Sequence, residues 1–277
     1  MTTDSFPRQY ARTRRFSLGE PRDLRISPDH STVFFARSKS GSDPVTCLWA
    51  CDLDTGRERL IVDPSELNAK SERSDAERAV RERLRESAEG ITSYDTDHGC
   101  TTAVFTVSGS VFRVDLATGE LTAVEVGAGA FDPRLSPDGQ RLAVVTGTTF
   151  KVVSIAAPQT PLIELSSDSA DTRWGVAEFI AAEEMGRTRG HWWSPDGTQL
   201  LLACVDNSSV SEWSLSDPAQ PWARHQSMKY PAAGTAKATV TFHLVDLSSR
   251  ALTPVEWDAT AFEYVARASW DSFGPLL

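Results

Sequence analysis

The stretch WWSPDGTQLLLACVD, residues 192–206, reads as a tight turn followed by a strand. Proline fixes its own φ, glycine accepts a positive φ, and the apolar run after the turn is typical of a buried strand. The same order recurs in LRISPDHSTVFFAR from Leu24 and in PRLSPDGQRLAVVTG from Pro133. Weaker copies of the turn begin at Asp97, with Gly99 as its expected turn glycine, and at Trp270. The chain is therefore built from a repeated turn-and-strand unit.

A second turn follows in several units and joins two further strands. It consists of an Asp-Leu pair and small polar residues, in segments that begin at Cys47, Val111 and Phe242. Four short strands per unit, repeated along a chain, are typical of a β-propeller, in which each unit forms one blade. We therefore expect an all-β chain: a partial β-propeller of about four to five blades with helical insertions. Function is expected on the insertions, since these emerge as loops.

Composition narrows the class of protein. The 38 acidic and 28 basic residues give a net charge of −10, which repels phosphate backbones and anionic membranes, so neither nucleic acid nor a membrane is an expected partner. The N-terminus lacks the apolar core of a signal peptide, and no apolar run reaches about 18 residues, so a soluble cytoplasmic chain is expected. Cys47 and Cys51 have no further Cys or His at ligand spacing, and we predict neither a metal nor a cofactor.

Two insertions interrupt the strand pattern. Residues 65–89 are rich in Glu, Arg and Ala without Gly or Pro, which predicts a charged helix. Residues 174–197, WGVAEFIAAEEMGRTRGHWWSPDG, place Glu183 and Glu184 after a short apolar helical pattern. By themselves, a charged helix and a pair of neighbouring glutamates are most simply solvated surface.

The wider context of these insertions resembles a known family. Three segments occur in the family's order along most of the chain: AERAVRERLRESAEGITSYD, GVAEFIAAEEMGRTRGHWWSPDG and MKYPAAGTAKATVTFHLVDL. Together they resemble the N-terminal propeller of dipeptidyl peptidase IV-type prolyl dipeptidyl aminopeptidases, serine peptidases of the prolyl oligopeptidase superfamily. In that family an eight-bladed propeller caps an α/β-hydrolase domain, and a Glu-Glu pair from the propeller holds the free amino terminus of the peptide substrate.

The resemblance implies roles for particular residues. Glu183 and Glu184 match the Glu-Glu pair and are expected to bind the substrate ammonium. The charged helix is expected to supply an arginine for the carbonyl oxygen of the substrate's second residue, with Arg81, Arg83 and Arg85 as candidates. Arg81 and Arg85 share a helix face, so we predict that one of these two makes the contact.

Three neighbouring positions bear on the Glu-Glu motif. Arg187 matches the arginine that follows the pair in the family, and we expect it to form a salt bridge with a local carboxylate. Gly186 stands where the family usually has Asp, and His191 where it usually has Tyr. These departures leave the rigidity of the loop open without touching the glutamates.

Catalytic residues are not expected within residues 1–277. The sequence has no Gly-x-Ser-x-Gly nucleophile elbow, and its five histidines lie in turns, loops or strands. We therefore expect a partial N-terminal propeller domain, inactive alone, whose partners are a peptide with a free N-terminus, an absent C-terminal hydrolase domain and, in the full protein, a second copy in a homodimer. The alternatives are a free-standing propeller that acts as an interaction scaffold, and the propeller of a related oligopeptidase or acylaminoacyl peptidase.

Overall fold

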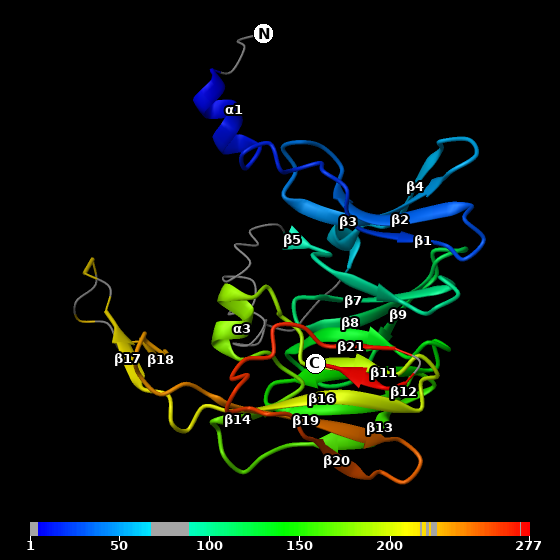
Figure 1. Ribbon diagram of the computed structural model, residues 1–277. Helices are drawn as coiled ribbons and strands as arrows, with labels where there is room; N and C mark the ends of the chain where they lie inside the picture. Colours follow the sequence, from blue (N-terminus) through cyan, green and yellow to red (C-terminus); the bar gives the residue numbers. More distant parts are fainter. Residues whose placement is uncertain (1–4, 68–88, 217, 220–221, 223–225, 272) are drawn as a thin grey trace. The chain divides into compact units, whose positions relative to one another are not determined.

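A computed structural model describes residues 5–67, 89–216, 218–219, 222, 226–271 and 273–277. Short strands in mostly antiparallel sheets are the main regular structure of these residues (Figure 1). The chain divides into two compact units, Met1–Gly147 with Lys151–Leu162, and Thr148–Phe150 with Ile163–Leu277. No helix among the described residues is long and apolar enough to cross a membrane.

Four sheets follow one another along the chain as the predicted blades. Blade 1 consists of β1 (Arg22–Ile26), β2 (Thr32–Ser38), β3 (Val45–Asp52) and β4 (Glu58–Val62), with β5 (Glu89–Gly90) parallel to β3. Blade 2 consists of β6 (Tyr94–Thr96), β7 (Thr102–Val107), β8 (Ser110–Asp115) and β9 (Leu121–Val124). Blade 3 consists of β10 (Ala130–Leu135), β11 (Arg141–Thr146), β12 (Thr149–Ser154) and β13 (Ala157–Leu165).

Blade 4 is the blade that carries the Glu-Glu motif. Its strands are β14 (Thr172–Trp174), β15 (His191–Trp193), β16 (Gln199–Asp206), β19 (Thr239–Asp246) and β20 (Leu252–Val255). Two further pairs of strands are β17 (Glu212–Leu215) with β18 (Gln226–Lys229), and β21 (Ser269–Trp270) with β22 (Pro275–Leu276). The described helices are α1 (Phe6–Arg12), the 3-10 turn η1 (Pro64–Glu66) and α3 (Phe179–Glu184).

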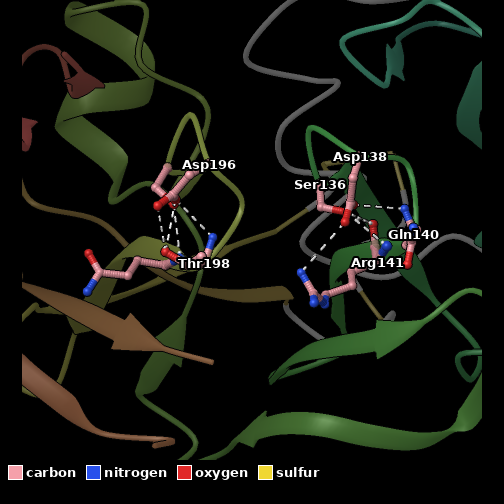
Figure 2. A network of polar contacts seen from close by, with 8 residues as sticks. Ser136, Asp138, Gln140, Arg141, Asp196 and Thr198 are labelled. Atoms are coloured by element: carbon pink, nitrogen blue, oxygen red, sulfur yellow. Dashed lines mark hydrogen bonds and ion pairs between the residues drawn. The ribbon is translucent and has the colours of Figure 1, made fainter. Parts of the chain in front are cut away.

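The Ser-Pro-Asp-Gly turns have the hydrogen bonds that their sequence predicts. In blade 3 the Gly139 amide donates to the Ser136 carbonyl at 2.8 Å. The Asp138 carboxylate accepts the Ser136 hydroxyl at 2.5 Å and the Gln140 amide at 3.0 Å, and Figure 2 shows this turn together with its counterpart around Asp196. Each aspartate thus binds its own turn and leads the chain into the next strand.

The turn at Asp97 differs by one residue from the sequence prediction, which took Gly99 as its turn glycine. The left-handed residue is Cys100, with a φ of 50°, and its amide donates to the Asp97 carbonyl. Asp97 stands where the other turns have serine, and its carboxylate accepts the Thr101 and Thr102 amides at 2.8 Å each. The Asp97 carboxylate thus accepts both amides that a serine and an aspartate share in the other turns. The left-handed position therefore lies one residue later than the sequence predicts.

The second turn of a blade is hydrogen-bonded to the first. In blade 1 the Leu53 amide donates to the Ser31 carbonyl at 2.8 Å, and in blade 4 the Leu247 amide donates to the Thr198 carbonyl at 3.1 Å. Each acceptor directly follows the left-handed or glycine position of its first turn. The repeat seen in the sequence is therefore also a repeat of hydrogen bonds, which supports the division into blades.

Candidate functional site

Within the second insertion, the chain departs from blade 4 and rejoins it opposite the same residue of strand β16. Strands β14 and β15 both pair antiparallel with β16, on the two sides of Ala203. The Gly175 amide donates to the Ala203 carbonyl, and the Ala203 amide donates to the Gly190 carbonyl, each at 2.8 Å. Residues 176–189, the insert, therefore start and end opposite a single residue of the sheet.

Glycine is required where the two ends of the insert meet. A Cβ atom on Gly190 would lie 2.2 Å from the Val176 amide nitrogen, well inside van der Waals contact. Gly175 has a φ of 74°, in the left-handed region that favours glycine. Val176 and Arg189 pair as an isolated antiparallel bridge. These four residues form a neck that fixes the base of the insert.

The insert contains the short helix that the sequence predicted, α3. Glu178 caps its first turn, because both carboxylate oxygens accept backbone amides there, at 2.5 and 2.7 Å. Glu178 is buried, with 6% of its surface exposed. After the helix, Gly186 turns the chain back with a φ of 68°, and the Arg187 amide donates to the Ala181 carbonyl at 2.9 Å.

Glu183 and Glu184 are the last two residues of α3, and both are exposed. The carbonyls at the end of a helix carry partial negative charge, so acidic side chains there are unfavourable by a few tenths of a kcal/mol each. Their position is therefore not explained by the stability of the helix. Two adjacent carboxylates open to solvent are suited to bind a cation that donates several hydrogen bonds.

Arg187 lies under the helix and is almost fully buried. Its Nε donates to the Val265 carbonyl at 2.8 Å, and its Nη2 lies 3.9 Å from Oε1 of Glu178. The guanidinium also lies over the Phe242 ring, 5.6 Å from its centroid. Burial lowers the pKa of Arg187, while the charge of Glu178 opposes this shift. The predicted salt bridge with a local carboxylate is confirmed.

His191, where the family usually has Tyr, is fully buried at the start of β15. Its Nδ1 lies 3.0 Å from the Gly175 carbonyl oxygen, and its ring packs against Phe150 with 5.1 Å between centroids. The imidazole thus keeps an aromatic ring in the neck and adds a hydrogen bond to one of its glycines. This departure from the family pattern leaves the neck well packed.

Residues 68–88 of the predicted charged helix lie outside the described residues, and its predicted ends are not α-helical: Ser65 and Glu66 belong to the 3-10 turn η1, and Glu89 begins β5. Arg81, Arg83 and Arg85 are therefore not placed, and their predicted role stays a prediction. No group of three or more His, Cys, Asp or Glu side chains among the described residues is arranged to hold a metal ion.

Comparison with known proteins identifies the family. Residues 104–275 match the profile of the family described as Dipeptidyl peptidase IV (DPP IV) N-terminal region, which covers blades 3 and 4, the insert and most of blade 2. The chain belongs to this family. Its sequence is 27% identical to human dipeptidyl peptidase 8 in an alignment of 236 positions that covers 72% of this chain and 26% of that protein. The chain thus spans about a quarter of that relative.

One further relative in sequence and one in structure are similar to this chain. Pig dipeptidyl peptidase 4 is 30% identical over 138 residues, 48% of this chain and 18% of that protein. The crystal structure of Porphyromonas gingivalis dipeptidyl peptidase 4 superposes with a TM-score of 0.67 at 17% identity, covering 93% of this chain and 35% of the other. At that identity the superposition shows the propeller fold and nothing finer.

Two features of this dipeptidyl peptidase IV-family site were missed by the sequence analysis. Glu178 was not recognised as a helix cap, because the residues that usually cap a helix start are Ser, Thr, Asp and Asn, and glutamate is not among them. The neck was also missed. The sequence does have a glycine at each end of the insert, Gly175 and Gly190. Only the structure shows that both are hydrogen-bonded to Ala203 and therefore meet.

Proposed function

We propose that the insert binds the free amino terminus of a peptide substrate through Glu183 and Glu184. The protein would be a serine dipeptidyl peptidase that releases X-Pro and X-Ala dipeptides, and this chain would gate and anchor its substrates. The observation that supports this most directly is the exposed pair at the end of a helix whose base is fixed by the neck. The names of the relatives, all dipeptidyl peptidases, point to the same activity.

The chemistry of the pair suits this ligand. An N-terminal ammonium has three N–H donors and one positive charge, and two carboxylates accept from it in charge-assisted hydrogen bonds worth about 1.5–3 kcal/mol each. An amine held at a fixed distance from a nucleophile brings one peptide bond into reach. The anchor therefore sets the length of the released product, here two residues.

Two further parts complete the proposal. Arg81 or Arg85 binds the carbonyl oxygen of the second substrate residue, as the family resemblance implies. An α/β-hydrolase domain encoded after Leu277 supplies the nucleophile, the general base and the pocket for the second side chain. The coding sequence downstream of Leu277 tests this part: an open frame with a Gly-x-Ser-x-Gly segment is expected, and an immediate stop codon would favour an interaction scaffold.

Steady-state kinetics of the full-length enzyme test the role of Glu183 and Glu184 as the anchor. Glu183→Gln and Glu184→Gln are each expected to lower kcat/KM for Gly-Pro-nitroanilide at least about a hundredfold, since one lost charged contact costs about 2.7 kcal/mol of transition-state binding. Glu256→Gln, an exposed glutamate of the same compact unit, is the matched control and should leave the rate unchanged. Unchanged rates in both variants of the pair would contradict the anchor.

A further inference from the structure

Helix α3 is too short to hold its own direction. It has six residues, and isolated helices below about 12 residues are marginal in water. The neck fixes where the insert begins and ends, but the direction of the helix above it depends on contacts made by its side chains and by the chain that returns. The contacts beneath the helix are therefore the ones that decide where the glutamate pair lies.

Arg187 supplies those contacts in three directions at once. Its Nη2 lies 3.9 Å from the carboxylate of Glu178, which caps the start of α3. Its Nη1 donates to the Arg189 carbonyl in the neck at 3.2 Å, and its Nε donates to the Val265 carbonyl at 2.8 Å. A planar guanidinium with five donors makes this possible, and an ammonium cannot reproduce its geometry.

The third contact lies on a firmly held part of the chain. Val265 and Ala268 are buried in the same hydrophobic cluster as Phe242. Further along, the indole of Trp270 donates to the Trp192 carbonyl in β15 at 3.1 Å. The carbonyl that receives Arg187 is thus fixed to blade 4 independently of the insert, and serves as a reference point for α3.

Filling the space under the helix does not require a charge. The side chain of Arg187 is only 4% exposed, and burial of a charge costs free energy that a well-packed apolar side chain would not. In some proteins, buried ion pairs are retained because they fix one geometry. The three contacts of Arg187 join the helix cap, the neck and the reference point, and that geometry is what an apolar side chain could not provide.

We infer that Arg187 is a positioning residue: it locks α3 to the segment around Val265 and so sets the place of Glu183 and Glu184. The inference rests on the proposed function for its meaning in catalysis. The mechanical part, a lock between the insert and the segment at 262–268, stands separately.

Amide hydrogen exchange of the full chain tests the lock. In Arg187→Gln the exchange of residues 178–186 and 262–266 is expected to rise at least about tenfold, while that of β16 stays unchanged, because local opening becomes easier without global unfolding. Arg187→Lys keeps the charge but loses the planar guanidinium with its several donors. Its amide exchange is expected to rise in the same two segments, but less than in Arg187→Gln. If Arg187→Gln does not fold, Arg187→Lys alone tests the lock.

Lys237→Gln is the matched control. Lys237 is a cation bound to the same 262–268 segment, through an ion pair with Glu263 and a contact with the ring of Tyr264, and it is partly exposed. Its removal should leave the exchange of residues 178–186 unchanged. Unchanged exchange of residues 178–186 in both Arg187 variants, or an equal rise in Lys237→Gln, would overturn the lock.

Steady-state kinetics of the full-length enzyme then test the positioning role of Arg187. Arg187→Lys is expected to raise KM for a free-amine dipeptide substrate at least about tenfold with kcat changed less than about threefold, because the anchor is displaced while the chemistry is intact. A merely structural role would instead lower kcat with the folded fraction and leave KM alone. If Glu183→Gln has no kinetic effect, the proposed function fails, and hydrogen exchange still decides on the lock.

Discussion

The blade turns and the insert of blade 4 both use acidic residues, in opposite ways. In the turn at Asp196 the carboxylate accepts the Ser194 hydroxyl at 2.6 Å and the Thr198 amide at 3.0 Å, so its lone pairs are engaged by its own turn. At the end of α3, Glu183 and Glu184 extend into solvent. The comparison separates carboxylates that accept hydrogen bonds from the backbone beside them from carboxylates on an exposed helix end.

Glu178 shows that the difference is not one of residue type or location. It lies in the insert, five positions before Glu183, yet it is buried and both its oxygens accept backbone amides. It therefore belongs with the turn aspartates. The following predictions test this division, beginning with the change that should remove the insert from its place altogether.

Gly190→Ala is expected to have the largest effect. The added methyl would meet the backbone at Gly175 and Val176 at 2.2–2.4 Å, so the neck has to open, at a cost above about 4 kcal/mol of unfolding free energy or with loss of folded protein. Urea unfolding measures this. Gly41→Ala is the control, since its nearest contact would be 3.6 Å and its effect should be small. Equal stability of the two variants would show that the neck is not rigid.

Glu178→Ala should destabilise the protein by about 3 kcal/mol. It removes a helix cap and leaves the buried charge of Arg187 without its carboxylate. The matched change Glu184→Ala removes the same side chain from the exposed end of the helix and should cost less than about 0.5 kcal/mol. Thermal or urea unfolding of both variants checks the difference, and equal losses would erase the distinction between the two ends of α3.

Acid should weaken the blade turns, because their aspartates accept hydrogen bonds as carboxylates. The hydroxyl of Ser27 and the amide and hydroxyl of Ser31 lower the pKa of Asp29 to about 2, and hydrogen bonds likewise lower the pKa of Asp196. Because the folded pKa lies below the unfolded one, near 3.8, the stabilisation is present above about pH 4 and is lost as pH falls towards 2. The urea midpoint should therefore fall over that range.

Asp29→Asn isolates one turn in this experiment. Asparagine cannot titrate, so the variant should be less stable than the parent at pH 5 and should lose less of its stability between pH 4 and pH 2. Parallel curves for the two proteins would mean that this carboxylate contributes nothing to the pH dependence.

Glu184→Gln is expected to have the smallest effect on stability. Removing one negative charge beside the last carbonyls of α3 should raise the unfolding free energy by no more than about 0.5 kcal/mol. The same variant is expected to lose most of its peptidase activity in the full-length product. A clear loss of stability would instead place Glu184 among the structural carboxylates.

Sequence alone predicted the blades because their signals are local. The Ser-Pro-Asp-Gly turns and the Asp-Leu turns each carry their hydrogen-bonding groups within six residues, so the pattern and the structure coincide. The exception at Cys100 arose because a single aspartate replaced two residues of the pattern. Helix α3 was also predicted from its short apolar pattern.

The supports of the site could not be predicted in the same way, because they join distant residues. Arg187 was expected to pair locally, and it does, but its contact with Val265 crosses 78 residues of sequence. The neck depends on Ala203 lying opposite both glycines, which follows from sheet register and not from composition. Family resemblance predicts Glu183 and Glu184 as the candidate pair, while the contacts around their helix emerged only in three dimensions.

Because both ends of the insert meet at Ala203, the insert can be replaced by another segment without changing the blade around it. Since the chain departs and rejoins opposite one residue, the stretch between Gly175 and Gly190 can lengthen, shorten or change while β16 keeps its neighbours. Evolution could vary helix α3 on an otherwise constant blade. An engineer could graft a different binding loop between the same two glycines and expect the sheet to accept it.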